Sequence, residues 1–267
     1  MTPVTAAPAQ AGTAIGMSNL TVRFSSRRSQ TTALDDVSLD IEPGEFVTIV
    51  GPSGCGKSTL LKIVAGLVRP TSGEVSLLDR PVRGPQKEIG FVFQKAALLE
   101  WRGARANILL QAEMRGMDRA QAARRADELI EMTGLTGFEK ALPHELSGGM
   151  QQRVALCRAL LHSPPVLLMD EPFGALDALT REQMNAELHR IWRETGTTVV
   201  LVTHSIAEAV FLGTRVVVMS ARPGRIIRTF PVELPAHRDY AQVMSDPRFD
   251  RLATDLRGLL GSAAANH

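Results

Sequence analysis

Long hydrophobic runs are absent from this chain of 267 residues, and without a stretch of 18 or more apolar residues we expect no membrane-spanning helix. The first residues carry neither a basic head nor a continuous apolar segment, so we also expect no signal peptide. Only two cysteines occur, Cys55 and Cys157, too few for a disulfide framework or a cysteine-based metal site. These absences favour a protein of the reducing cytosol.

An excess of charge of either sign is also missing. Lysine and arginine total 30, aspartate and glutamate total 28, and the formal net charge is +2. This balance gives no electrostatic reason to expect nucleic acid or a lipid surface as a partner. With 44% hydrophobic and 22% charged residues, the composition suits a globular protein, and the length suits one α/β domain with an inserted subdomain.

The most informative segment is a glycine-rich loop between a predicted strand and a predicted helix. It consists of Gly51, Pro52, Ser53, Gly54, Cys55, Gly56, Lys57, Ser58 and Thr59. Residues 46–50 before it are short, apolar and partly β-branched, as in a strand buried on both faces. Residues 60–67 after it place apolar side chains at helical spacing. The pattern G-x-x-x-x-G-K-S in this setting predicts a phosphate-binding P-loop.

Each part of the P-loop has a role in binding a nucleoside triphosphate. Glycine lets the backbone curl so that successive N–H groups point at the β- and γ-phosphates. The helix N-terminus and the Lys57 ammonium add positive charge, and the Ser58 hydroxyl can bind magnesium. We interpret Cys55 as a small filler and not as a nucleophile, because phosphate is expected to occupy neighbouring Lys57.

The N-terminal part of the chain changes character twice. Residues 1–17 are rich in Ala, Thr, Pro and Gly without periodicity, and we expect them to be disordered. Residues 19–24 and 37–41 alternate apolar and polar side chains, which predicts antiparallel strands with one solvated face. The polar stretch 25–32 between them is interpreted as a loop.

Farther along, strand and helix patterns alternate in the way that is typical of a mostly parallel sheet. The predicted strands are two short ones between residues 73 and 94, and then 166–169, 198–202 and 215–219. Helical periodicity replaces them over about residues 95–160, with helices at 106–114 and 120–132, which predicts an inserted helical subdomain. We therefore expect an α/β nucleotide-binding domain over residues 18–230, followed by a short helical tail at 231–267 that includes an amphipathic helix near 250–260.

Two carboxylates, Asp170 and Glu171, follow the predicted strand at 166–169. This places them at the carboxyl edge of the sheet, where open α/β sheets bind their ligands. Asp170 would hold magnesium, usually through water, and Glu171 would orient and deprotonate the water that attacks the γ-phosphate. Two acids in a solvated turn are common in isolation, but the upstream P-loop favours the catalytic interpretation.

A second glycine-containing helix start lies at residues 146–152, with the sequence Leu-Ser-Gly-Gly-Met-Gln-Gln. Taken alone, this would be a helix cap and a turn. Because it shortly precedes a strand that ends in Asp-Glu, it resembles the signature of ABC-type ATPases. That resemblance spans about residues 19–225 and implies the P-loop NTPase fold of this family, with an antiparallel β subdomain and the helical insertion.

Further residues acquire roles from the resemblance. Gln94 matches the Q-loop glutamine, which senses magnesium and water and connects to the membrane partner. His204 matches the switch histidine that contacts the γ-phosphate, and Ser205 with Glu208 fits a capping box that would start a helix directly after it. Phe24 falls where the family commonly has a tyrosine stacked on adenine, and phenylalanine keeps the aromatic face.

In this family two subunits bind ATP head to tail, so the resemblance implies a homodimer with two equal ATP and Mg²⁺ sites. One chain would close over the nucleotide of the other through Ser147, Gly148, Gly149 and Gln151. Residues 175–177 look like the D-loop, which touches the opposite subunit through Asp177, although Gly174 replaces the usual serine.

The resemblance implies an ATP-hydrolysing subunit that energises a bacterial ABC importer through two transmembrane permease subunits. A solute-binding protein outside the membrane would act indirectly, and the ATPase would lie at the cytoplasmic face of the inner membrane. Segments 98–101 and 218–226 look like the branch that imports nitrate, sulfonates and taurine, although Glu100 stands where that branch usually has proline. Core packing of the insertion explains the apolar residues of segment 98–101 equally well.

Two alternatives belong to other functional classes. An ABC ATPase acting on nucleic acid or ribosomes tends to carry two cassettes or a long coiled coil, whereas this chain has one cassette and no sustained heptads over residues 95–146. A non-catalytic nucleotide-binding regulator would not need Lys57, Asp170, Glu171 and His204 to be intact. We expect the choice of transported solute to lie with the solute-binding protein and the permease subunits.

Overall fold

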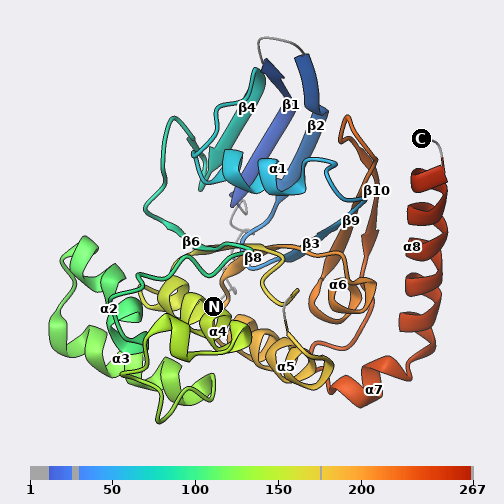
Figure 1. Ribbon diagram of the computed structural model, residues 1–267. Coiled ribbons are helices and arrows are strands. Elements are labelled where there is room, and N and C mark those ends of the chain that lie inside the picture. Colours follow the sequence, from blue (N-terminus) through green and yellow to red (C-terminus); the bar gives the residue numbers. More distant parts are fainter. Residues whose placement is uncertain (1–11, 26–29, 175, 266–267) are drawn as a thin grey trace, which may run out of the picture.

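A four-stranded antiparallel sheet forms one part of the molecule, as the computed structural model of residues 12–25, 30–174 and 176–265 shows (Figure 1). Its strands follow the order β2-β1-β4-β5. They are β1 (Ile15–Ser25), β2 (Gln30–Ile41), β4 (Ser72–Leu77) and β5 (Arg80–Pro81). The predicted boundaries here were wrong: residues 15–17 lie in β1 instead of in a disordered segment, and β2 begins seven residues before the predicted position 37.

Backbone pairing explains the longer hairpin. Arg23 pairs with Thr32 and Phe24 with Thr31, so the strands continue through polar residues that show no apolar alternation. Hydrogen bonds between the two backbones need no hydrophobic face. The alternation of apolar and polar residues therefore stops before the paired strands do, and it predicted strands that are too short. Much of the predicted loop is strand, and its residues 26–29 lie outside the described part of the chain, as do residues 1–11.

The central sheet has six strands in the order β10-β9-β3-β8-β7-β6. These are β3 (Phe46–Val50), β6 (Ile89–Val92), β7 (Val166–Asp170), β8 (Thr198–Val202), β9 (Arg215–Met219) and β10 (Ile226–Pro231). All pairs are parallel except β9 with β10. Every residue of β3, β7 and β8 is buried, as their continuous apolar sequences predicted. The mostly parallel α/β fold is confirmed.

Alternate residues of the central strands enter two separate cores. Val47 and Ile49 of β3 pack with the antiparallel sheet and with α1 (Lys57–Val64), whereas Phe46 and Val50 pack with the helices on the other face. The layers in Figure 1 are therefore antiparallel sheet and α1, central sheet, and helices. The last layer includes α5 (Ala178–Thr195) and α6 (Ile206–Leu212). This arrangement fixes α1 against the end of β3, where the P-loop lies.

The predicted helical insertion is present at the lower left of Figure 1. It contains α2 (Ala104–Arg115), α3 (Arg119–Met132), the 3₁₀ turn η1 (Pro143–Glu145) and α4 (Gly148–Leu160). Asp118 caps α3 by accepting a hydrogen bond from the Gln121 N–H at 2.8 Å. Apolar residues of α2, α3 and α4 join the core below the central sheet, so the insertion is packed onto the domain.

The C-terminal tail folds into α7 (Tyr240–Met244) and α8 (Pro247–Ala265), which confirms the predicted helix near residues 250–260. The preceding Arg238 is buried, and its guanidinium donates hydrogen bonds to the carbonyls of Val210, Phe211 and Gly213 at the end of α6. Burial lowers the pKa of Arg238 to about 10. None of the helices in the described ranges has the length and apolar character needed to cross a membrane.

Candidate nucleotide-binding site

The P-loop connects β3 to α1 in a tightly curled backbone. Gly54 and Gly56 have φ angles of 75° and 104°, which residues with a Cβ rarely adopt. A Cβ added at Gly51 would stand 2.9 Å from the Met219 carbonyl oxygen, and one at Gly56 would stand 2.6 Å from Leu34 Cδ2. The predicted need for glycine thus has two sources, backbone conformation and close packing against β2 and β9.

Lys57 is the first residue of α1, and its side chain folds back along the loop. Its ammonium group donates to the carbonyls of Gly51 at 2.8 Å and Pro52 at 2.9 Å. Cys55 is fully buried beside it, with its sulfur 3.7 Å from Lys57 Nζ, in agreement with its interpretation as a filler. No side chain caps the start of α1, so the helix N-terminus presents backbone N–H groups.

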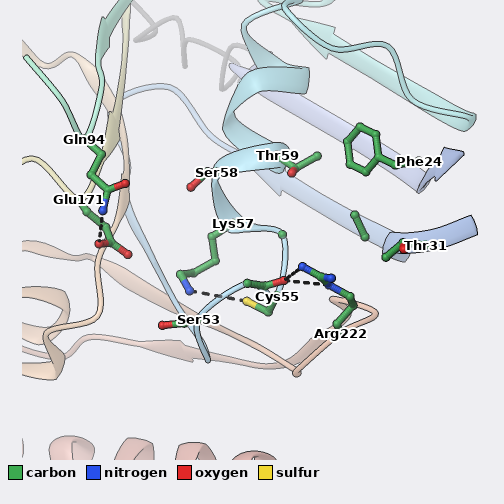
Figure 2. A pocket seen from close by; sticks show the side chains of 13 residues that line it. Phe24, Thr31, Ser53, Cys55, Lys57, Ser58, Thr59, Gln94, Glu171 and Arg222 are labelled. Carbon is green, nitrogen blue, oxygen red and sulfur yellow. Dashed lines mark hydrogen bonds between the residues drawn. The ribbon is translucent and has the colours of Figure 1, made fainter. Parts of the chain in front are cut away.

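A cavity of about 560 Å³ opens beside the P-loop. Figure 2 shows that Gln94 and Glu171 lie at one end of it, that Phe24 and Thr31 lie at the other, and that Lys57 and the loop lie between them. Phe24 is 48% exposed and lines the cavity, which leaves an aromatic surface at the end away from the carboxylates. No binding role was predicted for Thr31, Ala33 or Arg222, which also line this cavity.

Ser58 and Asp170 meet next to the P-loop. The Ser58 hydroxyl donates to Asp170 Oδ1 at 2.8 Å, and Asp170 is only 5% exposed. Burial raises the pKa of the Asp170 carboxyl, the hydrogen bond from Ser58 opposes this, and neighbouring Glu171 raises it further. The two residues come from α1 and β7 and are 112 positions apart in sequence.

This donor set suits magnesium. Mg²⁺ prefers oxygen ligands and commonly takes one or two carboxylates together with substrate phosphates. The hydroxyl of Ser58 and the carboxylate of Asp170 are such oxygens, and the amide oxygen of Gln94 is another at the same end of the cavity. Within the described ranges, no group of three or more His, Cys, Asp or Glu side chains could hold a metal by itself. The chemistry of the residues therefore fits an ion shared with phosphate.

Glu171 contacts Gln94, which was predicted to sense magnesium and water, and His204, which was predicted to contact the γ-phosphate. Its Oε2 accepts from Gln94 Nε2 at 3.2 Å and lies 3.4 Å from His204 Nδ1. The backbone of Glu171 is left-handed, with a φ angle of 46°, and its N–H donates to the Val202 carbonyl at 2.9 Å. Such strain in a non-glycine residue is concentrated at functional sites. The structure brings Gln94, Glu171 and His204 together.

The residues assigned to the partner nucleotide lie elsewhere on the chain, since none of Ser147, Gly148, Gly149, Gln151 and Asp177 lines this cavity. The Ser147 hydroxyl caps α4 by accepting from the Met150 N–H at 3.2 Å. Similarly, Asp177 caps α5 through the Thr180 N–H at 3.0 Å. In one chain these side chains stabilise helix starts, and their contact with a second nucleotide stays a prediction.

Gln151 and Gly149 fix the shape of that region. Gln151 Nε2 donates to the carbonyls of Pro143 at 2.9 Å and Leu146 at 3.3 Å. A Cβ added at Gly149 would stand 2.6 Å from Leu176 Cδ2, so the start of α4 touches the predicted D-loop. Residue 175 of that loop lies outside the described residues.

The capping box predicted after His204 is only half formed. Ser205 accepts from the Glu208 N–H at 3.3 Å, as expected, but the Glu208 carboxylate does not return to the Ser205 N–H. That N–H donates to Thr203 Oγ1 at 3.0 Å, and the Thr203 hydroxyl donates to Glu208 Oε2 at 2.5 Å. The Glu208 carboxylate points away from the Ser205 N–H because it also faces Arg181 of α5. Arg181 Nε lies 3.5 Å from Glu208 Oε1. Burial raises the pKa of Glu208.

Comparison with known proteins places this site in a family context. The family described as "ABC transporter" matches residues 34–174. The taurine import ATP-binding protein TauB of Roseobacter denitrificans is 46% identical over 241 residues, covering 89% of this chain and 90% of that protein. A putative ATP-binding protein of Brucella abortus is 50% identical over 217 residues, covering 81% of this chain and 83% of that protein.

A solved structure resembles the chain as well. The dimeric ATP-binding cassette MJ0796, in a post-hydrolysis state with ADP and phosphate bound, superimposes with a TM-score of 0.75 at 36% identity. The match covers 83% of this chain and 100% of that one.

Proposed function

Because the chain belongs to the ABC transporter family, we propose that it is the ATP-binding and ATP-hydrolysing subunit of an importer for a small sulfonate such as taurine. Several of its relatives are named as taurine import ATP-binding proteins. Their identities of 44 to 48% support a sulfonate as the transported solute. Nothing among these relatives supports action on nucleic acid or ribosomes.

The observation that carries the hydrolytic assignment is the meeting of Gln94 and His204 on the carboxylate of Glu171. This group lies at one end of a cavity whose wall is the P-loop. Glu171 accepts the proton of the attacking water, and its two hydrogen-bond partners orient the carboxylate. Its left-handed backbone at the end of β7 is held by the hydrogen bond from its N–H to the Val202 carbonyl.

The remaining residues of the cavity bind the nucleotide. Lys57 and the N–H groups at the start of α1 hold the β- and γ-phosphates, and Phe24 stacks on the adenine. Ser58 and Asp170 hold the magnesium with the help of Gln94, and the ion supplies positive charge that offsets the phosphate charge in the transition state. ATP therefore lies with its terminal phosphate toward Glu171 and its base toward the β1–β2 hairpin.

We place the chain in a homodimer that acts on two membrane-embedded permease subunits. The dimeric cassette that it resembles supports the pairing, and import by the named relatives supports the permeases. In that assembly Ser147, Gly148, Gly149 and Gln151 reach the nucleotide of the partner, and Asp177 faces the partner chain. The subunit then binds peripherally at the cytoplasmic side of the membrane, and a solute-binding protein delivers the substrate on the other side.

Replacing the general base tests the hydrolytic assignment. Glu171→Gln keeps the size and hydrogen bonding of the side chain but cannot accept a proton, so ATP turnover should fall by about 10²- to 10⁴-fold while ATP binding persists. Phosphate release and calorimetric ATP affinity provide the two measurements.

The matched control is Glu131→Gln, which removes an exposed carboxylate of α3 and should leave turnover unchanged. Turnover at the wild-type rate in the Glu171 variant would contradict the proposed role of Glu171. In reconstituted vesicles with the permeases and the solute-binding protein, taurine should stimulate ATP hydrolysis and nitrate should not.

A further inference from the structure

The loop between β9 and β10 contributes Arg222 to the wall of the nucleotide cavity. It has the sequence Ser-Ala-Arg-Pro-Gly-Arg at residues 220–225. Ser220 ties the loop together: its hydroxyl oxygen lies 2.9 Å from the carbonyls of Ala221 and Pro223 and accepts from the Arg225 N–H at 2.9 Å. The Ser220 N–H donates to the Arg225 carbonyl at 2.9 Å. The loop therefore holds its own shape.

The same loop is wedged between the antiparallel sheet and the P-loop. The Gly224 N–H donates to the Ala33 carbonyl at 2.9 Å, and the Gly224 carbonyl accepts from the Asp35 N–H at 3.0 Å. A Cβ added at Gly224 would stand only 2.0 Å from the Cys55 carbonyl oxygen. Backbone contacts with β2 on one side and with the P-loop on the other fix the position of Gly224. They also restrict Arg222, two residues before it.

Arg222 is the cation that this loop contributes to the cavity. Its Nε and Nη2 donate to the Gly54 carbonyl at 3.2 and 3.1 Å, and the side chain lines the cavity. Figure 2 shows the guanidinium between the P-loop and Thr31, on the side of the cavity that leads to Phe24. It therefore lies between the phosphate end and the base end.

The charge of Arg222 has no carboxylate partner among the described residues, and its Nη1 donates to none of their atoms. Arg225 of the same loop differs, because its guanidinium pairs with Asp35. A guanidinium has five N–H donors in a planar fork that matches the oxygens of phosphate. An arginine with unused donors at a phosphate-binding cavity is suited to an anionic ligand.

We propose that Arg222 binds the nucleotide directly, through the α-phosphate and the ribose that links it to the base. The inference rests on the proposed function, since it requires that this cavity binds a nucleotide. Gly54 positions one edge of the guanidinium, which leaves Nη1 for the ligand. The residue adds a positive charge to a cavity where Lys57, the other cation among the described lining residues, lies closer to Glu171 and Gln94.

Binding measurements on the full-length protein test this. Calorimetry with ADP should give an affinity about 10- to 100-fold weaker for Arg222→Gln, the range expected for one charge-assisted hydrogen-bond contact. Arg225→Gln, which removes the same charge from the same loop outside the cavity, should bind ADP within about twofold of wild type. If ADP affinity is unchanged in Arg222→Gln, or falls equally in both variants, the contact does not exist.

Pyrophosphate separates a direct contact from an effect on the shape of the P-loop. It contains the phosphates that the P-loop holds but lacks ribose and base, so its affinity in competition with ADP should change less than twofold in Arg222→Gln. An equal loss for both ligands would mean that Arg222 only shapes Gly54, which overturns the proposal.

Phosphorus NMR gives a readout that survives poor folding of the glutamine variant. Arg222→Lys keeps the charge and most of the side-chain volume but loses the fork. In bound ADP the α-phosphorus resonance should then shift relative to wild type while the β-phosphorus resonance stays in place. A shift of the β-phosphorus alone would contradict the proposal. Failure of the wild-type protein to bind ADP would instead overturn the proposed function itself.

Discussion

His189 is a buried histidine of α5 for which no functional role was predicted. It lies against Trp192 and Phe211, and its Nε2 has no hydrogen-bond partner within the described ranges. Burial, together with the nearby charges of Arg238 and Arg193, lowers the pKa of His189 to about 4. The folded protein therefore keeps this ring neutral at a pH where the unfolded chain protonates it.

A pH dependence of stability follows from this residue. Between the unfolded pKa of about 6.5 and the folded value of about 4, the unfolded chain binds the extra proton, so this contribution to stability is lost as the pH falls. Urea unfolding of His189→Gln should show a shallower dependence than wild type over that window, by at most about 1.4 kcal/mol per pH unit.

Other groups do not obscure this test. His162 behaves like His189, with its pKa lowered to about 4 mainly by burial, whereas Asp170 and Glu208 have raised pKa values and act in the opposite direction. All three are present in wild type and variant, so the difference between the two curves isolates His189. The exposed His144→Gln serves as the control variant. Identical slopes for wild type and His189→Gln would contradict the assignment.

Single residues were predictable where a motif surrounds them. Lys57, Glu171, Gln94 and His204 each stand in a recognisable local pattern, and the last three meet in the structure. Arg222 lies in segment 218–226, whose resemblance to the importer branch did not predict a place in the cavity, because its partner Gly54 is 168 residues away in sequence. Its position depends on the β9–β10 loop folding back over the P-loop, which is a property of the tertiary structure.

At the level of elements, α6 illustrates how helix ends are satisfied by distant parts of the chain. The last carbonyls of a helix have no partner within it. At the end of α6 the carbonyls of Val210, Phe211 and Gly213 accept hydrogen bonds from Arg238, which precedes α7. The guanidinium is buried there without a carboxylate partner in the described part of the chain, so backbone carbonyls alone solvate its charge.

Arg238→Met therefore should lower the free energy of unfolding. Methionine can fill much of the space but leaves buried carbonyls without donors, and we expect a loss of about 2 to 4 kcal/mol in urea unfolding. Arg251→Met, which changes an exposed arginine of α8, should stay within about 0.5 kcal/mol of wild type. Equal stability of both variants would show that water satisfies the end of α6.

Elements with a strong pattern of apolar residues were predictable from the sequence. Strands held mainly by backbone hydrogen bonds to a neighbouring strand were not. The apolar runs of β3, β7 and β8 identified buried strands because all their residues are inside. By contrast, β10 was missed, since Phe230 is its one buried residue and the strand is held at the sheet edge by backbone bonds to β9. The extension of β2 to Gln30 escaped notice for the same reason.

For the whole molecule, the separation of two predicted nucleotide contacts within one chain bears on the proposed homodimer. Lys57 lines the cavity, whereas Ser147 lies at the start of α4 outside the lining set. If the proposed homodimer forms, each site takes its P-loop from one chain and its Ser147 from the other. No single chain then completes a site.

Mixing two inactive variants tests this arrangement. Lys57→Met removes the phosphate-binding ammonium, and Ser147→Arg places a bulky side chain at the start of α4. In a heterodimer of the two, one site carries both changes and the other carries neither. Phosphate release from an equimolar mixture should exceed that of either parent, reaching at most about a quarter of the wild-type rate by random pairing. A mixture no more active than its parents would exclude a shared site.

The attachment of Arg238 to α6 also bears on how the protein can be shortened. An expression fragment that ends after β10 would lack Arg238. It would therefore lose the hydrogen bonds that satisfy the end of α6, the helix that begins just after His204. Trimming for crystallisation or for a fusion tag is therefore safer beyond α8 than before it. The segment after β10 looks like an appendage in the sequence, but in three dimensions its Arg238 supports the helix that follows His204.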